Sequence, residues 1–208
     1  MTHPHIILAS ASAGRARLLR EAGVDFDVVV SHVDEDEIVH LMGHDATVSE
    51  IVAALAAAKA HAVAEELADR VGDAIIVACD SVLDLDGVAH GKPANAHEAI
   101  SRWQFMRGRD GILRTGHHVI HVGIENTEMA AVASTTVHFG SPTDVEIEAY
   151  VATGIPMRVA GAFTIDGLAA PFIDGVDGDP SNVVGLSLPL LRRLLGELGI
   201  NWAELWKE

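Results

Sequence analysis

Short apolar runs separated by polar turns and helical stretches predict alternating strands and helices along the chain. The first run, Ile6–Ala9, has the length of a buried strand, and the helical pattern after it ends at Gly23. Ala74–Asp80 is the clearest strand, because it is apolar on both faces, as central strands covered by helices are. Further strands are expected at Phe26–Val30, Val82–Leu85, Val88–His90, His117–Gly123, Met129–Phe139, Val159–Ile165 and Ala169–Val176.

Capping signals mark the helices between these strands. Thr47 and Glu50 form a capping box ahead of an Ala-rich helix that we expect to reach about Asp69. Other helices are expected over Asn95–Arg107, Thr143–Gly154 and Leu188–Leu198. Loops or turns are expected at His32–Ile38, Gly108–Thr115 and Asp177–Pro180. Since βα units alternate with hairpins, the pattern predicts a mixed sheet in one α/β domain spanning residues 1–208.

Charge and composition narrow the class of protein. The formal net charge of −16 argues against sequence-independent binding to nucleic acid or to an anionic membrane. No stretch has the length of a transmembrane helix, and Met1–His5 does not resemble the start of a signal peptide. The single Cys79 lies in an apolar run, where it reads as a small buried hydrophobe. We therefore expect a cytoplasmic protein without disulfides.

The turn after the first strand has the features of an anion site. Ser10, Ser12 and Arg15 stand where a strand passes into a helix, so hydroxyls, a cation and free backbone N–H groups converge there. Ser12 could equally be only the N-cap of that helix.

Three further residues suggest chemistry. Lys59 falls on the apolar stripe of its helix, which is costly unless the ammonium reaches solvent or meets an anion. Asp80 ends a buried strand, a position near which α/β sheets bind ligands, although an Asp there can also be a turn residue. Lys92 is held in an extended turn between a glycine and a proline. Together with the first turn, they could hold the phosphates of a polyphosphate while carboxylates bind a divalent metal and orient a water.

The histidines, twelve in number, do not form a recognisable metal motif in the sequence. Neither a His-Glu-x-x-His segment nor a Cys/His cluster is present. The neighbours His117 and His118 would point to opposite faces of a strand. We therefore expect scattered surface or core histidines and no zinc site.

The ordered motifs resemble the Maf family of nucleoside triphosphate pyrophosphatases, also known as septum-formation inhibitors, over nearly the whole chain. The matching segments are Leu8–Ser12 with Arg15 and Leu18-Leu19, Asp34-Glu35, Lys59-Ala60, Asp80–Val82, Gly91–Pro93, Ala160–Phe163 and Ser181–Leu186. The resemblance implies an elongated α/β fold, similar to the ITPase fold, with a mixed sheet flanked by helices and a central cleft between two lobes. It also implies Mg²⁺- or Mn²⁺-dependent hydrolysis of a nucleoside triphosphate to monophosphate and pyrophosphate, often by a homodimer.

The same resemblance implies a role for each candidate residue. The catalytic set is Asp80, Lys92 and Lys59; the substrate-binding set is Ser10, Ser12, Arg15 and Asp166; the metal ligands are Glu35 and Asp80, of which Asp80 could instead be the general base. A positioned carboxylate base commonly accelerates a reaction by about 10²–10⁴-fold.

Three residues depart from the pattern common in the family. Gly14, Val159 and Asp166 stand where relatives often have an arginine or aromatic residue, a lysine and a glutamine, respectively. A carboxylate at position 166 could accept a hydrogen bond from a nucleobase, or Asp166 could be only a turn residue before Gly167. The departures leave the hydrolytic set intact, so they bear on whether the substrate is a standard pyrimidine nucleotide or a modified one.

The alternative to an enzyme is a protein that has the same fold and binds nucleotide but does not hydrolyse it. In that alternative the protein is a non-catalytic nucleotide-binding regulator of cell division or septum formation. Retention of every expected charged phosphate-site residue favours the enzyme, because an idle site has no need of Lys59 on an apolar face.

Overall fold

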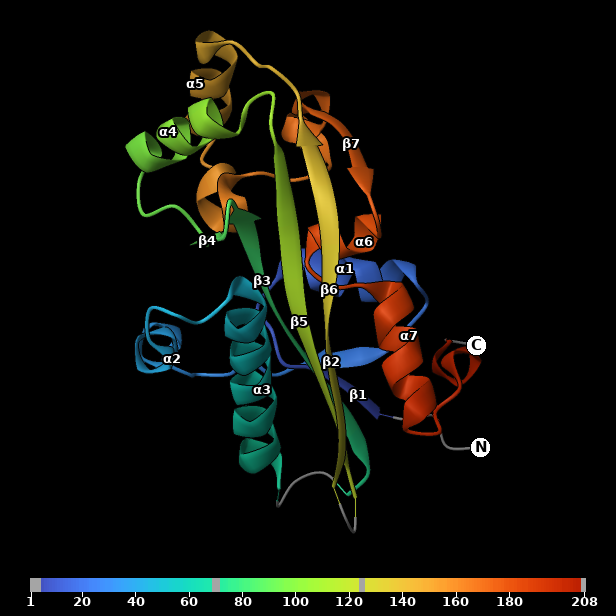
Figure 1. The fold of residues 1–208 in the computed structure, drawn as a ribbon. Helices are drawn as coiled ribbons and strands as arrows, with labels where there is room; N and C mark the ends of the chain where they lie inside the picture. Colours follow the sequence, from blue (N-terminus) through green and yellow to red (C-terminus); the bar gives the residue numbers. More distant parts are fainter. Residues whose placement is uncertain (1–4, 69–71, 124–125, 207–208) are drawn as a thin grey trace.

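The computed structural model describes residues 5–68, 72–123 and 126–206, which form a mixed α/β fold (Figure 1). Seven strands make one sheet in the order β2-β1-β3-β5-β6-β7, with β4 paired to the far end of β3. The strands are β1 (His5–Leu8), β2 (Phe26–Val28), β3 (Ala74–Leu85), β4 (Val88–His90), β5 (Asp110–Val122), β6 (Thr127–Phe139) and β7 (Ile173–Asp177). Strand β1 is parallel to β2 and β3, and the remaining pairs are antiparallel, as the predicted mixed sheet requires.

Helices flank both faces of this sheet. The α-helices are α1 (Ala13–Glu21), α2 (Glu35–Met42), α3 (Val48–Leu67), α4 (Ala96–Met106), α5 (Asp144–Ala152), α6 (Pro180–Val184) and α7 (Leu188–Glu197). Short 3₁₀ helices are η1 (Pro156–Arg158), η2 (Ala160–Ala162), η3 (Gly167–Phe172) and η4 (Trp202–Leu205). Among the described residues, no helix is long and apolar enough to cross a membrane.

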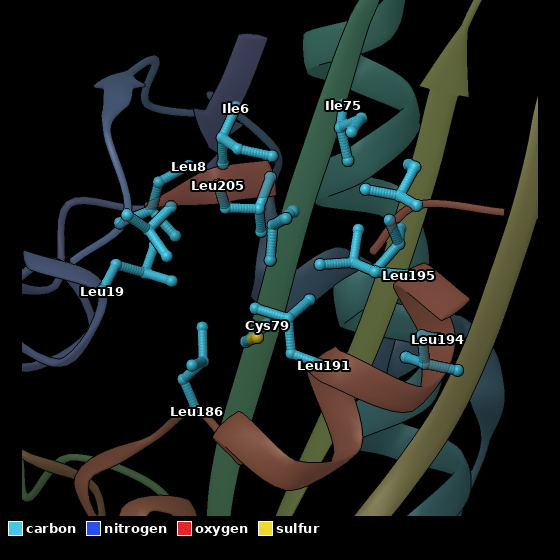
Figure 2. Close-up of a cluster of buried hydrophobic side chains, with 14 of the residues drawn as sticks. Ile6, Leu8, Leu19, Ile75, Cys79, Leu186, Leu191, Leu194, Leu195 and Leu205 are labelled. Atoms are coloured by element: carbon cyan, nitrogen blue, oxygen red, sulfur yellow. The ribbon is translucent and has the colours of Figure 1, made fainter. Parts of the chain in front are cut away.

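The alternation of side chains along β1 and β3 separates two hydrophobic clusters on the two faces of the sheet. On one face, Ile75 and Val77 pack with leucines of α1 and α7. Figure 2 shows Ile75 of this cluster together with Leu19 of α1 and Leu191 of α7. Cys79 is fully buried in this cluster, which confirms that it is a small buried hydrophobe, and burial raises the pKa of its thiol to about 11. On the other face, Ile76 and Ala78 pack with α3.

A third cluster lies farther along the same strands. It joins Leu83 and Leu85 of β3 and Phe139 of β6 to α4, α5 and the 3₁₀ helices. Trp103 of α4 is fully buried in it and donates a hydrogen bond from Nε1 to the Ala162 carbonyl at 2.8 Å. The hydrophobic core is therefore divided between the two ends of the long strands, in agreement with the two lobes expected.

Helix α3 lies so close to β5 that only glycine fits beneath it. A Cβ atom on Gly116 would stand 2.1 Å from the Val52 carbonyl oxygen, well inside van der Waals contact. The long helix predicted after Thr47 is confirmed with its capping box, and it ends at Leu67; Asp69 lies outside the described residues.

Two segments that were predicted to be loops form regular secondary structure, one a helix and the other mostly a strand. The acidic run contains α2, because the Asp34 side chain caps the helix by accepting from the Glu37 N–H, and three carboxylates in its first turn favour the helix dipole. The segment Gly108–Thr115 is mostly the start of β5, where pairing with β3 and β6 overrides its charged composition. Part of the turn predicted at Asp177–Pro180 likewise passes into α6.

The predicted strand Val159–Ile165 is wrong. Positive φ angles at Gly161 and Ala162 break any extended run, and η2 forms instead. The strand predicted from Ala169 begins only at Ile173, because the residues before it, with Pro171, form η3.

Candidate active site

The candidate site lies along one edge of β3. The parallel partner β1 pairs with β3 as far as Val77, and the hairpin partner β4 pairs only from Leu83 onward. Among the described strands, none pairs with this edge of β3 between those two points. Asp80 and Ser81 lie in this interval, so the Asp80 carboxylate lies beyond the end of β1 but in the middle of a continuous strand.

Arg15 approaches this interval from the α1 face. Its guanidinium donates from Nη1 to Ser10 Oγ at 2.9 Å, from Nη2 to Ser81 Oγ at 3.0 Å and from Nε to the Gly185 carbonyl at 2.7 Å. Arg15 is 9% exposed, yet no described Asp or Glu forms an ion pair with it. A buried cation without a carboxylate partner is costly in the free protein and is a favourable place for an anion.

Ser12 has the capping role that the sequence allowed. Its Oγ accepts from the Arg15 backbone N–H at 3.4 Å, and its own N–H donates to Ser10 Oγ at 3.2 Å. The cap fixes the start of α1, and therefore the direction from which the Arg15 side chain approaches the strand edge.

Lys59 approaches the same interval from the α3 face. Its Nζ lies 2.5 Å from Asp80 Oδ1 and 2.8 Å from Glu35 Oε1, while Lys59 itself is only 8% exposed. Of the two sequence alternatives for this residue, the structure thus supports the encounter with an anion. The contacts also bring Glu35, on the first turn of α2, to Asp80.

The pKa of Asp80 is raised above its ordinary value, chiefly because burial disfavours the charged carboxylate. The Lys59 ammonium offsets part of this effect. Raised carboxylate pKa values are typical of groups that accept or donate protons near neutral pH.

Two predicted residues are not brought into this cluster. Lys92 is exposed and forms no hydrogen bond or ion pair with the described part of the chain; its neighbour Gly91 accepts from Arg102 and from the Gly161 N–H through its carbonyl. Asp166 accepts a hydrogen bond from Arg17 of α1. It therefore lies next to the helix that carries Arg15, but touches neither Asp80 nor Lys59.

Gly14 has a packing role. A Cβ atom at this position would lie 3.1 Å from Val184 Cγ1 and 3.2 Å from the Val184 carbonyl oxygen. The absence of a side chain lets α1 approach α6, and α6 leads directly to the Gly185 carbonyl that holds Arg15.

Sequence reasoning assigned no role to Ser81, which accepts a hydrogen bond from Arg15, or to the polar residues next to Ser81. Ser81 and Thr115 are cross-strand neighbours with their hydroxyls 3.0 Å apart, and Asn182 of α6 donates to the Leu113 carbonyl and to Thr135. The alternation of β3, which places Ser81 on the Arg15 face and Asp80 on the Lys59 face, is the signal that could have assigned Ser81 this role in advance.

His117 supports the same region as a neutral side chain. Its Nε2 accepts from the Ser187 N–H at 2.8 Å at the start of α7, so Nδ1 carries the proton and donates to the Thr115 carbonyl at 3.0 Å. Burial lowers the pKa of His117 to about 4.

Comparison with known proteins agrees with these motifs. Residues 5–198 match the family described as Maf-like protein. A Streptomyces avermitilis protein named nucleoside triphosphate pyrophosphatase is 54% identical over 97% of this chain and 94% of its own length. Proteins of the same name from Streptomyces coelicolor (55% identical, covering 97% of this chain and 94% of that protein) and Mycobacterium sp. strain JLS (50% identical, 97% of each) are similar over the same extent.

Among solved structures, a HAM1 protein from Coxiella burnetii is similar to the chain with a TM-score of 0.44. The match covers 93% of this chain and 99% of that protein at 14% identity. The family match and the identities near 50% extend over the whole site, from Ser10 to Gly185. The chain belongs to the Maf-like protein family.

Proposed function

We propose that this chain hydrolyses a nucleoside triphosphate to the monophosphate and pyrophosphate. The observation that carries the proposal is Arg15, a buried cation without a carboxylate partner among the described residues, which shares one strand edge with the Lys59–Asp80 pair. The names of the relatives at 50–55% identity support the same activity.

Phosphate binding would depend on the unused donors of Arg15. A guanidinium has five N–H groups, and three bonds to protein are present here, so N–H groups of Nη1 and Nη2 remain for phosphate oxygens. The free N–H groups at the start of α1 would add to this attraction. Lys92, exposed and free of ion pairs with described residues, is available to a polyphosphate tail that extends toward β4.

Asp80 would act as the general base. Its Oδ1 contacts Lys59, whereas Oδ2 has no hydrogen-bond partner among the described groups. Oδ2 would accept a proton from the attacking water, the water oxygen would bond to phosphorus, and the bond between the α- and β-phosphoryl groups would break to release pyrophosphate. Lys59 holds the carboxylate in place and compensates part of its charge in this buried position.

The carboxylates present fit a divalent metal. Glu35 and Asp80 both contact the single Lys59 Nζ, so the two carboxylates lie near each other beside the strand edge. Oxygen donors of this kind suit Mg²⁺ and Mn²⁺. A bound cation would neutralise phosphate charge and polarise a phosphoryl oxygen. Glu35, which is half-exposed on α2, would be the ligand free to turn away from Lys59 toward that ion.

Base recognition would involve Asp166, as the sequence suggested. Its carboxylate can accept a hydrogen bond from a base N–H while Arg17 holds it against α1. An Asp166→Gln variant is expected to change the order of preference among nucleobases more than the maximal rate.

The test is a panel of standard and modified nucleoside triphosphates, each with Mg²⁺, Mn²⁺ or Co²⁺, with pyrophosphate and orthophosphate measured separately. We expect equal amounts of pyrophosphate and nucleoside monophosphate from those triphosphates whose nucleobase the site accepts. Failure of every combination to give pyrophosphate would refute the activity. Tight nucleotide binding without turnover would favour the alternative, a nucleotide-binding regulator.

The remaining expectations stay proposals that simple measurements can check. We propose one domain over residues 1–208, a homodimer, a cytoplasmic location and no binding to nucleic acid. The net charge of −16 supports the last of these. Light scattering would give the molar mass in solution, and cooperative unfolding in a single transition would support one domain.

A further inference from the structure

Three side chains that sequence reasoning treated as scattered meet beside α3, where that helix lies against β5 (Figure 1). His61 comes from α3, His118 from β5 and Glu128 from β6. One carboxylate oxygen, Glu128 Oε2, lies 2.9 Å from Nε2 of each histidine, and the two imidazole rings meet edge to face at 5.0 Å. A helix and two strands of a hairpin that follows much later in the sequence thus bring one ligand atom each to a common point.

The spacing of these atoms suits a tetrahedral metal ion. All three lie within 4.8 Å of one another. Bonds of about 2.0–2.1 Å in a tetrahedron put ligand atoms about 3.4 Å apart, so each 2.9 Å contact need widen by only about half an ångström. Two imidazoles and one carboxylate are a donor set of zinc sites that keep an open position.

A surface hollow of about 440 Å³ lies beside His61 and Glu128 and has room for a fourth ligand of the ion. It is lined by His61, Ala64, Glu65, Ala68, Ile120, Asn126 and Glu128. Glu65 follows His61 by one helical turn, so the two lie on the same face of α3. His118 is 7% exposed, whereas His61 and Glu128 are exposed, which leaves the point of convergence open to ions from solvent.

We propose that His61, His118 and Glu128 bind one divalent transition-metal ion, with Zn²⁺ as the best match, and that the ion ties α3 to the β5–β6 hairpin. The site is separate from the carboxylate pair of the active site. Lys59 is buried toward β3 while His61, two residues later, is exposed on another face of α3. The proposal does not depend on the hydrolytic function.

The experiment is a zinc titration of the full chain by calorimetry, with Co²⁺ absorption as a second readout of tetrahedral ligands. It is done in the Glu35→Gln/Lys59→Met/Asp80→Asn background, which removes the proposed active-site ligands without leaving a buried unpaired charge, so that any zinc bound at the proposed active site is absent from the measurement. We expect one ion per chain, an affinity at least about tenfold weaker after His61→Ala or Glu128→Gln, and a zinc-dependent rise in Tm that both substitutions abolish. Both residues are exposed, so these variants should fold.

His138→Ala is the matched control. His138 also contacts two carboxylates, but through different ring nitrogens, Nδ1 to Asp110 at 2.7 Å and Nε2 to Asp177 at 3.2 Å, so its partners do not converge. Zinc affinity unchanged by His138→Ala and lost with His61→Ala supports the site. No stoichiometric zinc in the Glu35→Gln/Lys59→Met/Asp80→Asn background, or equal affinity in the His61→Ala variant, would overturn it.

Discussion

Lys59 compensates the charge of the buried Asp80 and also contacts Glu35. Lys59→Met would leave the buried Asp80 without its cation, so we expect the free energy of unfolding to fall by about 3 kcal/mol. Chemical denaturation measures this loss.

The control is a double-mutant cycle. Lys59→Met/Asp80→Asn removes both charges, and we expect it to be more stable than Lys59→Met alone, since the unpaired charge is gone. Simple addition of the two single losses would contradict the ion pair as the reason for the buried lysine.

His117 makes the stability of the protein depend on pH. Its pKa is about 4 in the folded protein and about 6.5 when unfolded, so the unfolded chain binds more protons between these values. The contribution of neutral His117 to the free energy of unfolding is present in full above about pH 7. It falls by about 3 kcal/mol as the pH drops to about 4. His117→Gln cannot titrate, so its unfolding free energy should change less over the same range; parallel curves for the two proteins would be evidence against a buried neutral His117.

Residues of the candidate site could be predicted where a short local motif singles out one side chain. Arg15, Lys59 and Asp80 were singled out from local sequence, and the structure brings all three to one strand edge; their binding and catalytic roles are the proposal made above. The meeting of His61 with His118 and Glu128 was missed, because it depends on strand register and helix placement, to which no local pattern corresponds.

At the scale of elements, α2 delivers Glu35 without contributing to the core, since none of its residues is buried. Asp34→Ala removes its N-cap at a cost of about 1 kcal/mol to that helix. We expect kcat/KM to fall several-fold, with Tm nearly unchanged, because only the position of Glu35 is loosened.

Thr143→Ala is the control, for which we expect a loss of stability without a loss of activity. Thr143 caps α5, whose Ile147 and Tyr150 are buried in the core cluster around Trp103. This variant should lower Tm and leave the activity per folded molecule intact. A Tm loss with Asp34→Ala as large as with Thr143→Ala would contradict the peripheral role of α2.

The contact between α3 and β5 is the other element-scale requirement. In Gly116→Ala, the new Cβ would collide with the Val52 carbonyl, so α3 must shift, and we expect a loss of about 3 kcal/mol or more. Activity should also decrease, because α3 carries Lys59. Thermal unfolding and initial rates measure the two effects.

Gly196→Ala is the matched substitution. Gly196 lies within α7 and is exposed, and a Cβ atom added there would meet no other atom within 4 Å, so alanine should stabilise the helix by about 0.5–1 kcal/mol. Equal stability for the two variants would show that α3 does not need the glycine.

Element prediction succeeded where capping and apolar periodicity agree and failed where tertiary pairing decides. Thr47 and Thr143 marked real helices with complete capping boxes. The start of β5 was not predicted. Its composition is typical of a loop, but β3 and β6 on either side supply its backbone hydrogen bonds. The residues around Gly161 resemble a strand in composition. In the structure they form a 3₁₀ turn with a left-handed glycine, and the Ala162 carbonyl accepts a hydrogen bond from Trp103.

For the whole molecule, the mixed sheet flanked by helices was predictable, because the order of strands and helices restricts the topology. The unpaired interval on the edge of β3 was not predictable. It arises because β1 stops at Leu8 and β4 pairs only from Leu83, so helices from both faces reach one strand edge. In the function proposed above, this interval is a hydrolytic site in which Asp80 is the base.

The most direct test compares pyrophosphate release by the wild-type protein and by Asp80→Asn, at saturating nucleotide and metal. We expect the rate to fall by about 10²–10⁴-fold, with nucleotide affinity retained within a few-fold, because Arg15 and its partners are untouched. Asparagine keeps the shape and removes the basic oxygen. Release of pyrophosphate by Asp80→Asn at the wild-type rate would contradict the role of Asp80 as the base.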